Sequence, residues 1–177
     1  HATPDPLWSR GLGDVYKRQA LEGLVIGGIT WFFEVALDLP GIGILAAFLT
    51  FMILASMITI YRAGLIRWDR NLAIAVYSSL FAIILIYIFS IIGAVTGLFQ
   101  VPYIHDATPL GIAFSLFVVG IGALCLVADF DFIERGVQMG APKQLEWRAA
   151  FGLMVTLIWL YLEILELLAK IAIYSRR

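Results

Sequence analysis

The sequence predicts an all-α membrane protein, a polytopic helix bundle. Hydrophobic residues make up 62% of the chain and charged residues 14%, and the mean hydropathy is +0.94. Such a composition provides too few polar side chains to cover a water-soluble globule. The apolar residues fall into five runs of spanning length. Each run is predicted to be a helix, because a single strand in lipid leaves its backbone groups unpaired.

The charge balance excludes one class of partner. The chain has 12 Lys and Arg residues against 13 Asp and Glu residues, so it is close to neutral. A nucleic-acid partner would require a basic face for its phosphates, and none is predicted. The single cysteine, Cys125, lies inside an apolar run and cannot form an intrachain disulfide. Its expected role is that of a small buried hydrophobe.

Residues 1–19, HATPDPLWSRGLGDVYKRQ, differ from everything that follows. The segment is polar and mixed in charge, and it has neither the apolar core nor the small-residue cleavage site of a signal peptide. Its end, DVYKRQ, resembles the translation of a transposon end used in preparing sequencing libraries. We therefore interpret residues 1–19 as non-native sequence and predict the membrane bundle over residues 20–177, with the N-terminal part of the natural protein missing.

The first three predicted helices cover residues 20–37, 41–61 and 72–99. About 20 residues are needed to cross the hydrocarbon core, and each run approaches or exceeds that length. The turn Asp38-Leu39-Pro40-Gly41 separates the first two, and an arginine-rich connection separates the second from the third. Glycines at positions 23, 27 and 28 permit close packing of the first helix.

The last two predicted helices cover residues 109–128 and 149–172. Pro102 and Pro109 bracket the short loop before the fourth helix, and Gly140-Ala141-Pro142 interrupts the longest polar connection. Small residues recur along the fourth helix, which again favours close packing in lipid. A compact bundle is therefore expected, rather than a set of separate anchors.

Loop charges predict the orientation of the bundle. The loop after the second helix and the loop after the fourth helix are rich in Lys and Arg, whereas residues 100–109 contain neither. The positive-inside rule places the two basic loops in the cytoplasm and the neutral one outside. The C-terminal tail is also basic, with Lys170, Arg176 and Arg177, although strict alternation places it outside. Full crossing is favoured over a re-entrant fifth helix.

Acidic residues inside or beside the runs are the candidate functional groups. Asp129 and Asp131 follow the fourth run at its cytoplasmic end, while Glu163 and Glu166 lie within the fifth. At 1.5 Å per residue Glu163 is about 20 Å deep, past the midplane. Insertion scales put the cost of such a carboxylate at roughly 2.5 to 3.5 kcal/mol, so it is expected to face a pathway, a cavity or a partner.

Helical spacing also brings other side chains to this region. Trp159, Glu163, Glu166 and Lys170 are spaced to share one face of the fifth helix. Glu22 begins the first run on the cytoplasmic side, and several carboxylates are thereby predicted to line one route. The supporting acidic residues of this route are as follows: Glu22, Asp131, Glu134 and Glu166.

Structural explanations of the same residues stay open. Asp129 and Asp131 end a span, where charges cost far less than at its centre, and Arg135 and Lys143 are close enough in sequence to neutralise them. Glu163 is equally compatible with a hydrogen-bonded packing role. Glu166 is four residues from Lys170, the spacing of an intrahelical ion pair.

Four segments together resemble a known family. They are ADFDFIERG, GAPKQLEWRAAFGLMVTLIWLYLEILELLAK, ALEGLVIGG and VPYIHDATPLGIAFSLFVV. Over essentially all of residues 20–177 the chain resembles the bacterial branch of the Bax inhibitor-1 family, also described as YccA-like or as the transmembrane BAX inhibitor motif family. The resemblance implies a seven-helix bundle around a central C-terminal helix, of which five helices would be present here.

The resemblance further implies a pH-sensitive calcium leak in the bacterial inner membrane, controlled by two acidic residues that share a proton. Asp129 in ADFDFI and Glu163 in LYLEI fall on the two family positions. Two carboxylates in a low-dielectric site cannot both ionise cheaply, and loss of their shared proton creates a charge that attracts a basic group or Ca²⁺. Glu163 departs from the family's aspartate by one methylene, and the connection between the two positions is longer than in the better-studied branch.

Two further classes of function are weighed. Motifs of hydrolases, metalloproteases and phosphate-binding loops are absent, and the Gly-x-Gly-Asp context of intramembrane aspartyl proteases is absent as well, so no enzyme and no resident cofactor are expected. The alternative to transport is a stress-response membrane protein that binds and restrains a quality-control protease or a translocon component. In either case the expected surroundings are membrane lipid, and Ca²⁺ or protons are the expected ligands, with Ca²⁺ at Asp129 and Glu163.

Overall fold

The computed structural model describes residues 7–97 and 106–176. These residues form five helices and no strand, which confirms the all-α prediction. Four of the five helices are long and apolar enough to cross a membrane. The chain divides into two units, residues 1–43 and residues 44–177.

The first unit contains helix α1, Leu7–Ala36, and the turn that follows it. The turn uses Asp38 at φ 51° and Gly41 at φ 84°, a left-handed conformation that glycine adopts without strain. Glu34 supports it, because its Oε1 atom accepts a hydrogen bond of 3.2 Å from the backbone nitrogen of Gly43. Helix α1 continues without a break across residue 20, where native sequence was predicted to begin.

Helix α1 is not among the four candidate spans, although a span was predicted at residues 20–37. The helix ends at Ala36, and its apolar stretch carries two carboxylates, Glu22 and Glu34. These acidic residues and the three glycines lower its hydropathy below that of the other helices. The spans found in the described residues therefore number four rather than the predicted five.

The second unit is built from four helices whose ends are fixed by capping residues. They are α2 (Ile42–Arg62), which begins in the preceding turn, α3 (Arg70–Thr96), α4 (Pro109–Gln138) and α5 (Gln144–Ser175). Asp69 caps α3 by accepting a 2.8 Å hydrogen bond from the nitrogen of Leu72, and Thr108 caps α4 in the same way. Gly97 ends α3 at φ 66°. Most of the neutral loop predicted before α4 lies outside the described residues.

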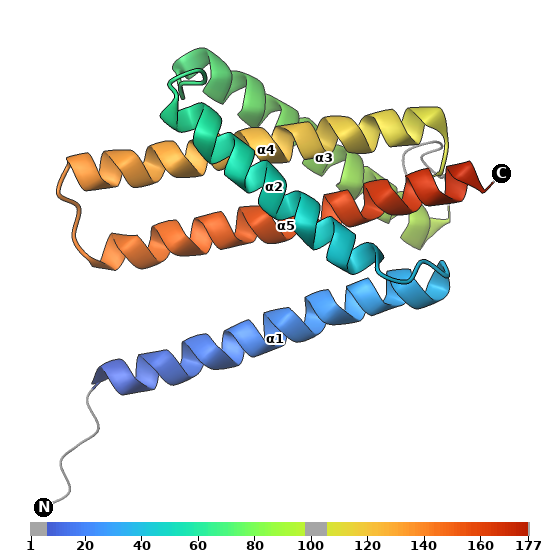
Figure 1. The fold of residues 1–177 in the computed structure, drawn as a ribbon, viewed down its shortest axis with the longest axis horizontal. Helices are drawn as coiled ribbons and strands as arrows, with labels where there is room; N and C mark the ends of the chain where they lie inside the picture. Colours follow the sequence, from blue (N-terminus) through green and yellow to red (C-terminus); the bar gives the residue numbers. More distant parts are fainter. Residues whose placement is uncertain (1–6, 98–105, 177) are drawn as a thin grey trace, which may run out of the picture. The chain divides into compact units, whose positions relative to one another are not determined.

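Helices α4 and α5 form the main packing interface of this unit and run side by side (Figure 1). A Cβ atom added at Gly122 on α4 would lie 3.0 Å from Leu160 Cδ1 on α5, so the glycine lets the two helices approach. Helix α3 packs against another face of α4 through a cluster of buried residues. Its members are Val76, Ile83, Val118 and Ile121.

The most enclosed helix of the second unit is α4. In its most apolar stretch 44% of the residues are buried, compared with 22% for α5. Helix α5 packs chiefly against α4 and is joined to α3 by the hydrogen bond from Tyr87 to Glu163, and its central place in a larger bundle stays a prediction. The seven-helix arrangement stays an expectation. Large apolar side chains are exposed on all four helices, which is expected where the surrounding solvent is lipid.

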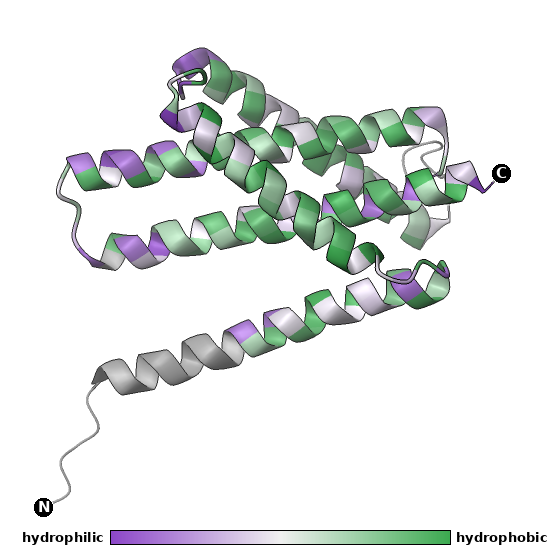
Figure 2. Cartoon of the chain, in the orientation of Figure 1, coloured by the Kyte–Doolittle hydropathy of each residue, from purple (hydrophilic) through white to green (hydrophobic). Residues whose placement is uncertain are grey.

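Helices α4 and α5 are longer than a membrane requires. They contain 30 and 32 residues, which at 1.5 Å per residue gives about 45 to 48 Å against a hydrocarbon core of about 30 Å. Their hydropathy falls toward the connection between them, where hydrophilic residues gather (Figure 2). We call this end, residues 129–149, the α4–α5 hairpin end.

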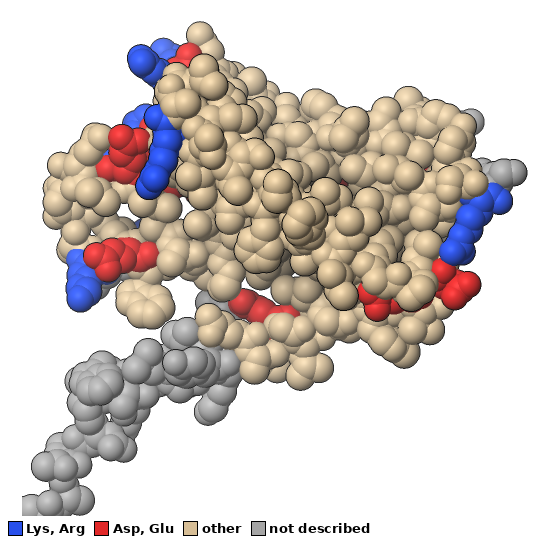
Figure 3. Space-filling model, viewed as in Figure 1, with Lys and Arg blue, Asp and Glu red and all other residues tan. Residues whose placement is uncertain are grey.

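The two basic connections lie at the same end of the second unit. Tyr61, at the end of α2, packs against Phe130 on α4 with ring centroids 5.8 Å apart and the rings tilted by 52°, and its hydroxyl donates to Glu134. These contacts bring the α2–α3 connection beside the α4–α5 hairpin end. Acidic and basic side chains are correspondingly concentrated there (Figure 3). The positive-inside rule requires this coincidence, because it assigns both connections to the cytoplasm.

Candidate functional site

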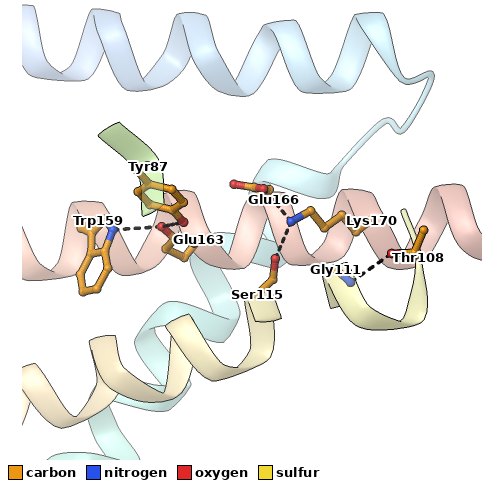
Figure 4. Close-up of polar contacts among 8 residues, drawn as sticks. All are labelled: Tyr87, Thr108, Gly111, Ser115, Trp159, Glu163, Glu166 and Lys170. Carbon is orange, nitrogen blue, oxygen red and sulfur yellow. Dashed lines mark hydrogen bonds and ion pairs between the residues drawn. The ribbon is translucent and has the colours of Figure 1, made fainter. Parts of the chain in front are cut away.

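The deepest carboxylate of the bundle, Glu163, is held by donors from two helices. Its side chain is 6% exposed. The Oε1 atom accepts a 2.8 Å hydrogen bond from the hydroxyl of Tyr87 on α3 and a 3.0 Å hydrogen bond from the indole nitrogen of Trp159, one turn earlier on α5 (Figure 4). The Oε2 atom is buried and has no hydrogen-bond partner. One carboxylate oxygen is therefore fixed, and the other is left to bind a proton or a cation.

A buried lysine lies two turns further along the same face. Lys170 is 4% exposed, and its Nζ atom contacts Glu166 Oε1 at 2.7 Å and the hydroxyl oxygen of Ser115 on α4 at 2.7 Å (Figure 4). The intrahelical ion pair between Glu166 and Lys170 was one of the open alternatives, and it is formed. Lys170 was counted among the basic residues of the C-terminal tail. Because it is buried and paired with Glu166, it does not add a positive charge to the exposed tail.

Asp129 faces α5 near the hairpin end of the bundle. Its Oδ1 atom lies 3.8 Å from the position that a Cβ atom of Gly152 would take, and Thr156 is its side-chain hydrogen-bonding neighbour. The Oδ2 atom is buried and has no hydrogen-bond partner, as for Glu163.

The structure does not bring Asp129 and Glu163 together. Glu163 follows Thr156 by seven residues on α5, which corresponds to about 10 Å along the helix axis. The two helices are antiparallel, and Asp129 lies beside Thr156 of α5, whereas Ser115 lies beside Lys170. No hydrogen bond joins Asp129 and Glu163 in the described residues, and their proton-sharing pair and joint Ca²⁺ site stay predictions.

The sequence as a whole was compared with known families. The model of a family described as Bax inhibitor 1 like matches residues 14–173. The chain belongs to the Bax inhibitor 1-like family. The match covers all four candidate spans almost completely, and it begins inside the segment that was set apart as non-native. Comparison with curated proteins and with solved structures gave no match.

The supporting acidic residues of this Bax inhibitor 1-like protein occupy three different places. Asp131 forms a 2.7 Å ion pair with Arg135, as one open alternative proposed, and Glu134 accepts hydrogen bonds from Tyr61 and from Gln138. Both lie at the hairpin end. Glu166 lies beside Lys170, and Glu22 belongs to α1 in the first unit. Within the described residues no three His, Cys, Asp or Glu side chains come together as a metal-binding group.

Two functional contacts of this Bax inhibitor 1-like chain were missed by the sequence analysis. Tyr87 reaches Glu163 across 76 positions of sequence, and Ser115 reaches Lys170 across 55. A single tyrosine or serine in an apolar run gives a weak signal, because either residue also packs without a specific partner. The usable clue was the recurrence of small residues on α4, since a stripe of this kind marks the face that a neighbouring helix approaches.

Proposed function

We propose that this protein is a pH-sensitive leak pathway for Ca²⁺ in a bacterial cytoplasmic membrane. The observation that carries the proposal is the carboxylate of Glu163, which lies within a candidate span, is 6% exposed and keeps one buried oxygen without a partner. Ionisable groups at such depth are costly, and they mark ion or proton pathways far more often than surface charges do. Membership of the Bax inhibitor 1-like family favours the same class of function.

The polar groups follow the seam between α4 and α5. From the hairpin end inward the seam passes Asp129 with Thr156, then Glu163, and then the pair of Glu166 and Lys170. Each free carboxylate oxygen is a hard ligand of the kind that Ca²⁺ prefers. Asp129 and Glu163 are proposed as successive stations of the route rather than as one shared site. Asp131 and Glu134, at the hairpin end of the same unit, are proposed to raise the cation concentration at its entrance.

Protonation supplies the pH sensitivity in this scheme. When Glu163 is ionised, its unpartnered oxygen attracts a cation that enters from the Asp129 side. When Glu163 takes up a proton, that attraction is lost, while the ammonium of Lys170 further along the seam continues to repel cations. The expected flux therefore falls as pH falls.

The test is Ca²⁺ flux into liposomes that contain the purified full-length chain, measured across roughly pH 6 to 8, where coupled buried carboxylates titrate. The unmodified chain is expected to show a flux that rises with pH. Glu163→Gln is expected to keep its fold and to lose the pH dependence. Glu146→Gln, an exposed change in the first turn of α5, is the control and should behave like the unmodified chain. A pH-dependent flux that survives Glu163→Gln would overturn the assignment.

A non-transport function is the second candidate, and the hairpin end is the observation that favours it. Val137 and Met139 are each 77% exposed there, and Trp147 is 63% exposed. Because α4 and α5 exceed the length of a span, these apolar side chains are available to a protein partner at the membrane surface. A regulator of a membrane quality-control protease or translocon component would use such a surface. It would move no ions in liposomes without its partner, which separates the two candidates.

A further inference from the structure

A pocket of about 770 Å³ lies where α2 ends beside α4, and no part of the proposed leak uses it. Its volume falls within the range of sites that bind small molecules, about 300 to 1,000 Å³. All of its residues belong to the second unit. They come from the end of α2, the α2–α3 connection and α4, with Leu153 of α5.

The pocket contains charges of both signs. Arg62 and Arg67 contribute guanidinium groups, and Asp131 and Glu134 contribute carboxylates. The carboxylates already have partners, since Asp131 pairs with Arg135, outside the pocket, and Glu134 accepts from Tyr61 and Gln138. In the described part of the chain neither Arg62 nor Arg67 forms an ion pair. Two guanidinium groups without a carboxylate partner are suited to bind a phosphate.

The remaining walls are aromatic and aliphatic. Trp68 and Tyr61 bring rings with a polar edge, the kind of side chain that gathers where membrane meets water. Ile58, Ile133 and Leu153 supply aliphatic side chains to its wall. The charged residues follow the end of the α2 span, so a ligand here has its polar group at the interface and its apolar part along the helices. A phospholipid has this division, whereas a free phosphate compound lacks the apolar part.

We propose that this pocket binds a phospholipid with a zwitterionic, amine-bearing headgroup of the phosphoethanolamine type. Arg62 and Arg67 hold the phosphate, and the free lone pairs of Glu134 and Asp131 accept hydrogen bonds from the primary ammonium. A headgroup with only negative charge satisfies the arginines but offers no hydrogen-bond donor to the two carboxylates. A quaternary ammonium cannot donate hydrogen bonds to them. The pocket thereby distinguishes three common phospholipid headgroups by charge and by donor content.

The test is native mass spectrometry of the full-length chain in detergent, titrated with phosphatidylethanolamine, phosphatidylcholine and phosphatidylglycerol of matched acyl chains. Phosphatidylethanolamine is expected to bind one molecule per chain about tenfold more tightly than the other two, the effect of about one charge-assisted hydrogen bond. Equal affinity for all three lipids would overturn the proposal. Soluble glycerophosphoethanolamine, which has the same headgroup without acyl chains, distinguishes a lipid from a soluble ligand. If it binds as tightly as the lipid, the ligand is a soluble phosphate compound and the proposal of a lipid site is wrong.

Variants assign the headgroup contacts. The double change Arg62→Gln with Arg67→Gln is expected to weaken the binding of all three lipids about tenfold, whereas Arg148→Gln, on α5 and outside the pocket, should change nothing. Glu134→Gln can still accept from Tyr61, and it is expected to remove the preference for phosphatidylethanolamine while leaving the other two affinities unchanged. If the arginine variant does not fold, the proposal is tested by the loss of preference in Glu134→Gln alone. A preference that survives Glu134→Gln contradicts the assignment of the ammonium.

Discussion

The ion pair between Glu166 and Lys170 offers a quantitative test of how burial sets the energy of a charge pair in this bundle. The partners differ in environment, because the side chain of Lys170 is 5% exposed and that of Glu166 is 30% exposed. Removing one partner of a buried pair leaves the other charge uncompensated and costs about 3 to 5 kcal/mol. The cost should therefore depend on which partner is removed.

Glu166→Gln is expected to lower the free energy of unfolding by about 3 kcal/mol, the lower limit of that range, because Lys170 keeps its bond to Ser115. Lys170→Met is expected to cost only about 1 kcal/mol, since the remaining carboxylate is partly exposed and screened. The double variant places two uncharged side chains of similar volume at the site. It should be more stable than Glu166→Gln alone, with a coupling energy of about 2 to 3 kcal/mol.

The assay is equilibrium unfolding of the purified protein in mixed detergent micelles, followed by circular dichroism. Asp131 and Arg135 provide the matched control pair. They have the same spacing and the same 2.7 Å separation, but Arg135 is 58% exposed and Asp131 is 17% exposed. Asp131→Asn leaves the exposed Arg135 without its partner and should cost less than about 1 kcal/mol. The reasoning is refuted if Glu166→Gln costs no more than Lys170→Met, or if the exposed pair proves as strong as the buried one.

Three further predictions concern stability in the same assay. Ser115→Ala removes the acceptor of the 2.7 Å hydrogen bond from Lys170 and should cost about 1.5 to 3 kcal/mol, whereas Ser56→Ala, at an exposed serine that bonds its own helix, should cost less than about 0.5 kcal/mol. Gly122→Leu should cost about 1 to 3 kcal/mol through overpacking against Leu160. Gly120→Leu, with nothing within 4 Å of its Cβ position, should be neutral or stabilising. Equal effects at the two glycines would contradict the close approach of α4 and α5 at Gly122. Asp69→Ala should cost about 1 kcal/mol by removing the cap of α3, and Asp69→Asn should restore most of it, an outcome that a purely electrostatic role would not give.

The sequence predicted contacts within one helix better than contacts between helices. Trp159, Glu163, Glu166 and Lys170 were placed on one face of α5 by their spacing, and the bonds within this face are formed. Helical geometry fixes such neighbours regardless of the rest of the fold. The donor from Tyr87 belongs to a different helix, and only tertiary packing brings it to Glu163.

The expected pair of Asp129 and Glu163 shows why register is harder to predict than helix content. Predicted spans ended at Ala128 and began at Ala149, whereas the helices continue to Gln138 and begin at Gln144. Hydropathy locates the membrane portion of a helix, but it does not reveal how far the helix extends into water. The longer hairpin fixes which residues of α4 and α5 lie opposite each other, and it places Asp129 beside Thr156.

Helix α3 gives the site a property that its residues alone do not have. Only Val76, Ile83 and Gly93 are buried among its 27 residues, and the first two lie seven residues apart along a single line of contact. A helix held along one line tilts more easily than one that interdigitates with its neighbour over its whole length, and spanning helices tilt to match the thickness of the bilayer. Because Tyr87 is carried on α3, a change in the tilt of this helix would move the donor of the hydrogen bond to Glu163, and lipids of different chain length are the means to test whether the carboxylate responds.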